Sequence, residues 1–242
     1  REKWTFASEM VFHDIVDDKQ LDWFGVPFWD GYYAKGKSKI RNGKFGFSPI
    51  GWLESNVVQI TDSKHFWYDP TGKTFHIFMR ANTGITNWAC VIKAVEQDDG
   101  SINTMLQLAP SGKKQLYIPF PGGEMKFAVV YDDKTKLYWL LGTQPTDSMT
   151  RPEFLASDRY GLGDNERRRL VLHFSKNMID WCFAGLVAIG ATPLESRHYA
   201  GMAVDGDDLV ILSRSGDARA KSAHDGNLIT FHRVKNFRGL VY

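Results

Sequence analysis

Apolar and polar positions repeat one pattern three times along this chain: an apolar strand, a turn that contains an aspartate, and a second apolar strand. The three stretches are residues 67–80, 130–141 and 203–214. Short apolar runs on either side of an acidic turn are typical of β-hairpins. The turn aspartates Asp69, Asp132 and Asp205 recur at intervals long enough for one four-stranded blade and a loop. The pattern therefore predicts an all-β fold of the β-propeller class.

The segments around the hairpins extend this pattern to whole blades. Polar or ionisable residues begin each apolar run before a hairpin, as expected for the innermost strands of a propeller, where a funnel opens and ligands bind. These runs are residues 54–60, 124–130 and 197–203, with residues 8–13 as a fourth candidate, and the predicted third strands are residues 88–93, 170–175 and 228–233. About four blades are expected, the first of them poorly defined.

A long insertion, residues 144–166, separates the second and third strands of the middle unit and is rich in Pro, Asp, Ser and Gly. Loops of this length are more often functional than structural, so the insertion is expected to form a lid or a specificity wall.

Length and charge narrow the class of protein. A chain of 242 residues is ample for one domain, and its net charge of +2 indicates neither a nucleic-acid partner nor a membrane surface. No apolar run is long enough to span a bilayer. The chain begins at Arg1 without an initiator Met or a leader, so we expect a single propeller domain, residues 1–242, that lacks N-terminal blades of a five- or six-bladed ring.

Aromatic residues make up 14% of the chain, including 8 Trp, and flat rings either stack on sugars or fill the space between blades. The two cysteines are too few for a disulfide framework, and both Cys90 and Cys182 are expected to be buried free thiols. The histidines are scattered singly, so neither a metal site nor a cofactor is expected.

Four arginines lie at or beside the ends of strands that face the predicted funnel: Arg80, Arg167, Arg197 and Arg214. A guanidinium donates two parallel hydrogen bonds in a fixed fork, which suits a carboxylate ligand. Each arginine taken alone is interpreted as a salt-bridge residue on the surface or between blades, whereas their shared placement favours a ligand site.

The order of these residues resembles the sialidase (neuraminidase) family over most of residues 54–242. Residues 54–59, followed by a hairpin that ends at Arg80, resemble the segment in which a catalytic Glu begins a strand and a triad arginine ends the hairpin. Residues 167–175 are similar to the strand of the last triad arginine, and residues 197–206 to the strand of the nucleophilic tyrosine. The resemblance implies Glu54 as the base, Tyr199 as the nucleophile, and Arg80 and Arg167 as carboxylate ligands.

The chain departs from the family in two respects. The first triad arginine and the acid/base aspartate have no convincing counterpart, although Asp14, Asp17, Asp18 and Asp30 are available acids in the first unit. The Asp-box turn of the family survives only in altered form at residues 175–181, where Asn177 replaces the aspartate.

The chemistry of the residues is self-consistent. A tyrosine has an unperturbed pKa of ~10, so as a nucleophile it needs a neighbouring base and a positive field, which the glutamate and the arginines would supply. A phenol also avoids placing a carboxylate nucleophile against an anionic sugar.

The expected function is exo-hydrolysis of a terminal acidic sugar of a glycan with retention. The alternative is a carbohydrate-binding propeller without catalysis. A secreted or periplasmic location is implied by the resemblance alone.

A second polar cluster occupies residues 213–217 and 223–227, with Asp217 and His224 as candidate sugar ligands. Such a dense polar loop either binds sugar hydroxyls or is tied down by side-chain turns. His224 and Asp225 make a weak acid/base pair, because adjacent residues on a strand point to opposite faces.

Overall fold

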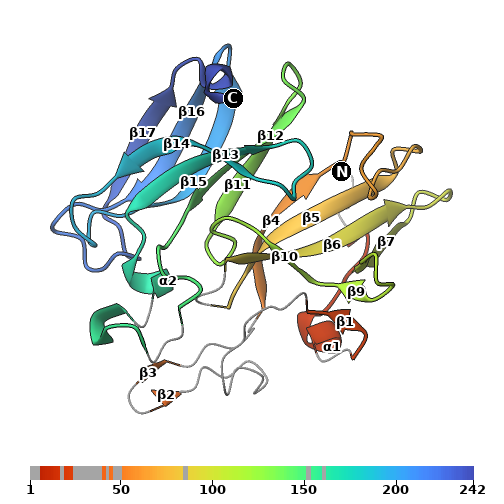
Figure 1. Cartoon of the computed structure of the whole chain (residues 1–242), viewed down its shortest axis with the longest axis horizontal. Coiled ribbons are helices and arrows are strands. Elements are labelled where there is room, and N and C mark those ends of the chain that lie inside the picture. Colours follow the sequence, from red (N-terminus) through yellow and green to blue (C-terminus); the bar gives the residue numbers. More distant parts are fainter. Residues whose placement is uncertain are drawn as a thin grey trace, which may run out of the picture.

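The computed structural model describes residues 6–16, 19–23, 40–41, 44–45, 51–83, 87–150, 154–159 and 162–242. Most of this part of the chain forms antiparallel sheets in which most neighbouring strands also follow one another along the chain (Figure 1). The all-β propeller class predicted from the hydrophobic pattern is confirmed. Among the described helices, none has the length and apolar character needed to cross a membrane.

Three meanders follow one another along the chain and have the strand order of propeller blades. In sequence they are β4 (Trp52–Val58), β5 (Thr74–Ala81), β6 (Trp88–Glu96) and β10 (Tyr117–Pro119), with β7 (Ile102–Met105) beside β6; then β11 (Phe127–Asp132), β12 (Leu137–Thr143), β13 (Arg169–Ser175) and β14 (Cys182–Ile189); then β15 (Arg197–Asp205), β16 (Asp208–Ser215) and β17 (Leu228–Val234).

Two of the three aspartates that the sequence pattern singled out cap a turn or loop between strands, whereas Asp205 ends β15 and accepts from Arg233 instead. The strand expected at the beginning of the 67–80 stretch is not formed, because Trp67 and Tyr68 lie in the loop between β4 and β5. The carboxylate of Asp69 accepts hydrogen bonds from the backbone and hydroxyl of Thr71, at 2.9 and 2.7 Å. Asp132 accepts from the backbone and hydroxyl of Thr135, at 3.0 and 2.6 Å. An acidic side chain that satisfies the amides of its own turn fixes the turn and hence the register of both strands.

The blades pack face to face, with their first strands side by side. β11 lies against β4 on one side and against β15 on the other. One apolar core, which includes Phe78, Phe120 and Tyr138, joins the first and second blades, and a second, which includes Trp139 and Ile211, joins the second and third. This packing brings the beginnings of β4, β11 and β15 together at one end of the molecule.

The N-terminal segment differs from the prediction. Residues 8–13 were expected to form an inner strand, but no strand occurs there, and α1 (Phe12–Val16) begins within the segment. Phe12 and Val16 are one helical turn apart, so both reach the same face and pack on the first blade beside Met79. A run this short has no periodicity that separates a strand from a helical turn.

Small elements surround the blades. β1 (Leu21–Asp22), β8 (Gln107–Leu108) and β9 (Lys114–Gln115) form a sheet, and β2 (Ile40–Arg41) pairs with β3 (Lys44–Phe45). The insertion of residues 144–166 does lie between β12 and β13 and carries the 3₁₀ turn η2 (Ser157–Arg159) and α2 (Leu162–Asn165).

The two cysteines have different environments. Cys90 is buried on β6, as predicted, and burial raises the pKa of its thiol. The prediction for Cys182 was wrong, because it begins β14, the outermost strand of its blade, where its side chain faces solvent.

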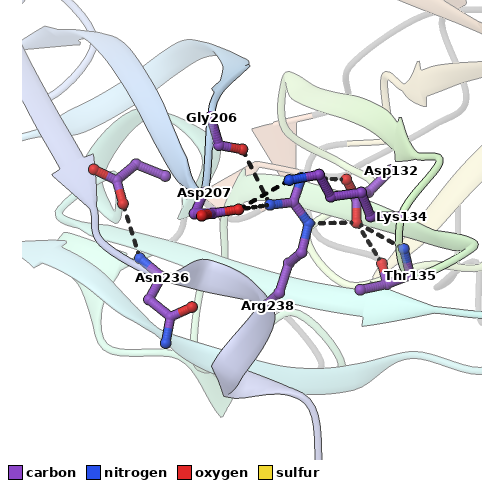
Figure 2. A network of polar contacts seen from close by, with 8 residues as sticks. Asp132, Lys134, Thr135, Gly206, Asp207, Asn236 and Arg238 are labelled. Atoms are coloured by element: carbon purple, nitrogen blue, oxygen red, sulfur yellow. Dashed lines mark hydrogen bonds and ion pairs between the residues drawn. The ribbon is translucent and has the colours of Figure 1, made fainter.

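A polar network ties the second and third blades together at the turn end of the inner strands (Figure 2). Arg238, on the 3₁₀ turn η3 (Phe237–Leu240), donates to both oxygens of Asp132, at 2.9 and 2.6 Å. The same guanidinium donates to Asp207 at 2.9 Å and to the carbonyl of Gly206 at 3.0 Å. Hydrogen bonding by Arg238 lowers the pKa of Asp132 to about 2. The network fixes the end of the blades opposite the candidate site.

Candidate functional site

The candidate site lies where β4, β11 and β15 begin. Glu54 is the third residue of β4, Tyr199 is the third residue of β15, and Lys126 immediately precedes β11. Because these strands lie side by side, three segments far apart in the sequence bring their polar residues to one end of the blades. This is the placement expected for a ligand site in a propeller.

Glu54 and Tyr199 share an unusual backbone conformation. Both have positive φ angles, 41° for Glu54 and 48° for Tyr199. Each coincides with a β-bulge, since the strand register shifts between Leu53 and Ser55 and between His198 and Gly201. In the described part of the chain, the other non-glycine residues with positive φ lie outside strands. Left-handed backbone in bulky residues costs on the order of 1–3 kcal/mol and clusters at functional sites.

Three arginines surround the side chain of Tyr199. Arg80, near the end of β5, donates from Nη1 to the tyrosine hydroxyl at 3.2 Å. The guanidinium carbons of Arg167 and Arg214 lie 5.4 and 5.5 Å from the centre of the tyrosine ring. Glu54 lies beside the guanidinium of Arg80, with its Oε1 3.7 Å from Nη1. The structure thus brings five of the residues singled out from the sequence into one cluster.

His198 contacts Arg167 beside the tyrosine. Both side chains are buried, and Nη1 of Arg167 lies 3.1 Å from Nδ1 of His198. A guanidinium only donates, so Nδ1 is the acceptor and the imidazole proton resides on Nε2. Burial, followed by the charges of Arg167 and Arg214, lowers the pKa of His198 to about 3. His198 is therefore neutral at physiological pH and adds no charge to the site.

His224 closes the other side of the cluster. Its ring meets that of Tyr199 edge to face, with centroids 5.9 Å apart. Asp225 lies 3.0 Å from Nδ1 of His224 and 3.7 Å from Nη2 of Arg214, and the hydrogen bond from His224 lowers the pKa of Asp225. The contact between His224 and Asp225 forms in a loop, where the alternation that made the pair look weak in the sequence does not apply.

Arg197 and Asp217 have contacts outside this cluster. Nη1 of Arg197 donates to the carbonyl oxygens of Ser196 and Gly216, at 2.7 and 2.9 Å. Asp217 accepts from Arg219 and from Asn227, and the hydrogen bonds from Arg219 lower its pKa. These contacts hold the loop between β16 and β17, so the structure gives both residues a role in shaping the loop.

Two charged residues of the cluster were not assigned a role from the sequence, although they begin the predicted strand of residues 124–130. Lys126 donates to the carbonyl of Ala200, and burial lowers its pKa while Glu54 raises it. The carbonyl of Glu124 accepts from Nε of Arg80 at 2.9 Å, and its carboxyl is buried. The sequence does show these charged residues at the beginning of an apolar strand. It does not show that this strand, β11, lies between β4 and β15.

The altered Asp-box turn joins β13 to β14 and is satisfied by its own side chains. Oδ1 of Asn177 accepts from the backbone of Ile179 and Asp180, at 3.0 and 2.8 Å. An amide oxygen therefore caps this turn at the position where the sialidase motif has a carboxylate.

Among the described residues, neither a metal-ligand group nor Asp14 contributes to the candidate site. Within the described ranges, no three His, Cys, Asp or Glu side chains are grouped as ligands of a metal ion. Asp14 is exposed on α1, and Asp17, Asp18 and Asp30 lie outside the described residues.

Comparison with known proteins gives only distant structural similarity. No protein-family model matches the chain, and no curated protein matches its sequence. Among solved structures, it is similar to a Trypanosoma rangeli sialidase in complex with sialic acid, at 15% identity and a TM-score of 0.40, over 80% of this chain and 23% of that one. It is also similar to a Penicillium chrysogenum α-L-arabinanase complexed with arabinobiose, at 8% identity and a TM-score of 0.37, over 81% and 47% of the chains.

A third similar structure is the levansucrase of Gluconacetobacter diazotrophicus, at 9% identity and a TM-score of 0.38, over 75% and 43% of the chains. The chain thus spans less than half the length of these three structures. All three are named as carbohydrate-processing enzymes, and the similarity is spread over several activities rather than confined to sialidases. Identities and TM-scores this low assign neither a family nor an activity.

Proposed function

We propose that this chain is a glycoside hydrolase that removes a terminal acidic sugar with retention, using Tyr199 as the nucleophile. The proposal rests on one observation: the hydroxyl and ring of Tyr199 contact three guanidinium groups, with Glu54 beside Arg80, at a strained bulge. A phenol surrounded by fixed positive charge is a better nucleophile because its developing phenolate is stabilised before the substrate arrives.

In the first step, the oxygen of Tyr199 forms a bond to the anomeric carbon while the glycosidic bond breaks, and the aglycone leaves as its oxyanion, which takes a proton from water. Glu54 takes the phenol proton, and the hydrogen bond from Arg80 to the tyrosine oxygen stabilises the charge during transfer. Oε2 of Glu54 is buried and accepts no hydrogen bond from the described residues, so it has room for that proton. Water then hydrolyses the glycosyl-tyrosine in the reverse sense, and two inversions give retention.

Arg80 and Arg167 bind the carboxylate of the sugar in this proposal, and Arg214 adds positive charge beside the tyrosine ring. The guanidinium of Arg167 is buried, so water screens its charge little, and the adjacent His198 is neutral. Three guanidinium groups around one phenol therefore favour an anionic ligand over a neutral one.

The test is hydrolysis of a panel of aryl glycosides, an α-sialoside, uronides and neutral sugars, by the wild type and by Tyr199→Phe. Aryl leaving groups depart as phenolates, so turnover does not depend on a protein acid. We expect hydrolysis of an acidic glycoside to fall on the order of 10³-fold or more in Tyr199→Phe. Tyr131→Phe is the matched control and should retain activity, because Tyr131 lies on β11 with its hydroxyl bonded to Thr61. Hydrolysis confined to neutral glycosides and unaffected in Tyr199→Phe would refute the mechanism.

One observation favours a second function, binding of an acidic sugar without cleavage. No carboxylate of the described residues is hydrogen-bonded to the hydroxyl of Tyr199, and Glu54 reaches it only through Arg80. Calorimetric titration with the free sugar acid distinguishes the two. Binding that is equal in the wild type and in Tyr199→Phe, with no turnover by either, would support the binding protein.

A further inference from the structure

Glu124 joins the candidate site to the insertion of residues 144–166. Its backbone carbonyl accepts from Nε of Arg80 at 2.9 Å, which leaves Nη1 of Arg80 directed at Tyr199. Oε1 of its carboxyl accepts a hydrogen bond from the hydroxyl of Ser148 in the insertion. Glu124 is 1% exposed and Ser148 is 4% exposed, so water does not compete for this contact.

The carboxyl has few other partners. Oε2 of Glu124 is buried and accepts no hydrogen bond from the described residues. The charged groups that act on the carboxyl are Arg80, which favours its ionised form, and Glu166, which opposes it. Burial is the largest influence and raises the pKa of Glu124 to about 7. The backbone amide of Glu124 and the hydroxyl of Ser148 both favour its ionised form, and a buried carboxyl with one side-chain donor is sensitive to loss of that donor.

We propose that Glu124 is a positioning residue that couples the 144–166 insertion to Arg80. The hydrogen bond from Ser148 to its carboxyl sets the orientation of the Arg80 guanidinium at Tyr199. The inference deepens the proposed function, since Arg80 is there a ligand of the substrate carboxylate. Loss of the Ser148 hydroxyl leaves the buried carboxyl without a side-chain donor, which favours rotation of the residue toward water. That rotation moves the carbonyl that holds Arg80.

The remaining ties of the insertion provide a matched control. Thr146 donates to Oε1 of Glu166 at 2.8 Å, and Arg159 pairs with Oε2 of Glu166 at 2.5 Å. Thr146→Ala therefore removes one hydrogen bond from the same segment without touching Glu124. Ser148→Ala removes the contact on which the proposal depends.

The experiment follows the Nε–H resonance of Arg80 by ¹H–¹⁵N NMR without substrate, assigned by its loss in Arg80→Lys. Ser148→Ala should shift this resonance and speed its exchange with solvent, whereas Thr146→Ala should leave it unchanged. In the wild type the resonance should titrate near neutral pH, and in Glu124→Gln, which keeps an acceptor oxygen but cannot ionise, that titration should disappear. An unchanged resonance in Ser148→Ala, or an identical titration in Glu124→Gln, would overturn the proposal even if both variants are less stable.

Kinetics give a second and separable readout. We expect Ser148→Ala to raise KM for an acidic aryl glycoside about tenfold and to lower kcat by less, because Arg80 binds the carboxylate and also donates to the tyrosine oxygen. A fall in kcat with KM unchanged would contradict the positioning role. If the wild type hydrolyses no glycoside, the proposed function fails, and the NMR comparison alone decides whether Glu124 couples the insertion to Arg80.

Discussion

At the scale of single residues, the candidate site combines strain with charge. Glu54 has a φ of 41° at a bulge in β4, a conformation that glycine adopts without cost. A residue in such a conformation lowers the stability of the fold while its side chain is held in position, as is common for active-site residues. The effect of the strain on the free energy of unfolding can be measured by removing the side chain of Glu54.

We predict that Glu54→Gly raises the free energy of unfolding by up to about 1 kcal/mol while abolishing hydrolysis. Glycine relieves the left-handed strain, and the ion pair with Arg80 that it removes is a long one, 3.7 Å between Oε1 and Nη1. Ser55→Gly, one residue along the same strand and exposed, should destabilise instead, because its backbone is not left-handed. Urea denaturation of the three proteins measures the difference. Equal destabilisation by both substitutions would show that Glu54 is not strained.

Sequence reasoning at this scale found the residues but not all of their neighbours. Residue type and the order implied by the family resemblance singled out Glu54, Arg80, Arg167, Tyr199 and Arg214, and these five side chains lie in one cluster. Arg197 has the same residue type and a similar position at the start of a strand. Its guanidinium nevertheless turns to two backbone carbonyls of its own loop. Side-chain direction depends on local backbone geometry, which residue type does not encode.

At the scale of elements, two of the three hairpins were predictable and the N-terminal segment was not. In the β11–β12 hairpin, two apolar strands flank Asp132, which caps its own turn, so that local signals agree. In α1, two apolar residues find a surface on the first blade, and this contact between distant segments decides the conformation. The C-terminal turn η3 is also held by distant partners, since Arg238 bridges the turns of two blades.

We predict that Arg238→Ala lowers Tm by several degrees, because it leaves Asp132 buried without its cation and disconnects the second and third blades. The side chain of Asp132 is only 3% exposed, and that of Arg238 is 14% exposed. Arg219→Ala is the matched control: its guanidinium makes a comparable pair with Asp217 but is 81% exposed, so Tm should change by no more than about one degree. Differential scanning calorimetry makes the comparison. A similar Tm for both variants would mean that the network in Figure 2 contributes nothing to blade docking.

At the scale of the whole molecule, several buried groups link stability to pH. Burial lowers the pKa of His76 and of His173 to about 4, and burial with nearby arginines lowers that of His198 to about 3. The unfolded chain binds protons at these residues near the ordinary histidine pKa of ~6.5. Their contribution to stability is therefore complete above about pH 6.5 and is lost as the pH falls toward 4.

Glu124 acts in the opposite direction, because its folded pKa, about 7, exceeds that of the unfolded chain. Its contribution is present at low pH and is lost as the pH rises through about 7. Three histidines outweigh one carboxyl, so we predict that the free energy of unfolding falls by several kcal/mol between pH 7 and pH 4. His173→Phe removes one histidine from a site on β13 that is edge to face with Phe183 at 5.6 Å, and it should flatten the profile. Glu124→Gln should steepen it, since the opposing group is gone. Urea titrations at fixed pH values measure both slopes, and a profile unchanged in either variant would show that the residue it replaces does not control acid stability.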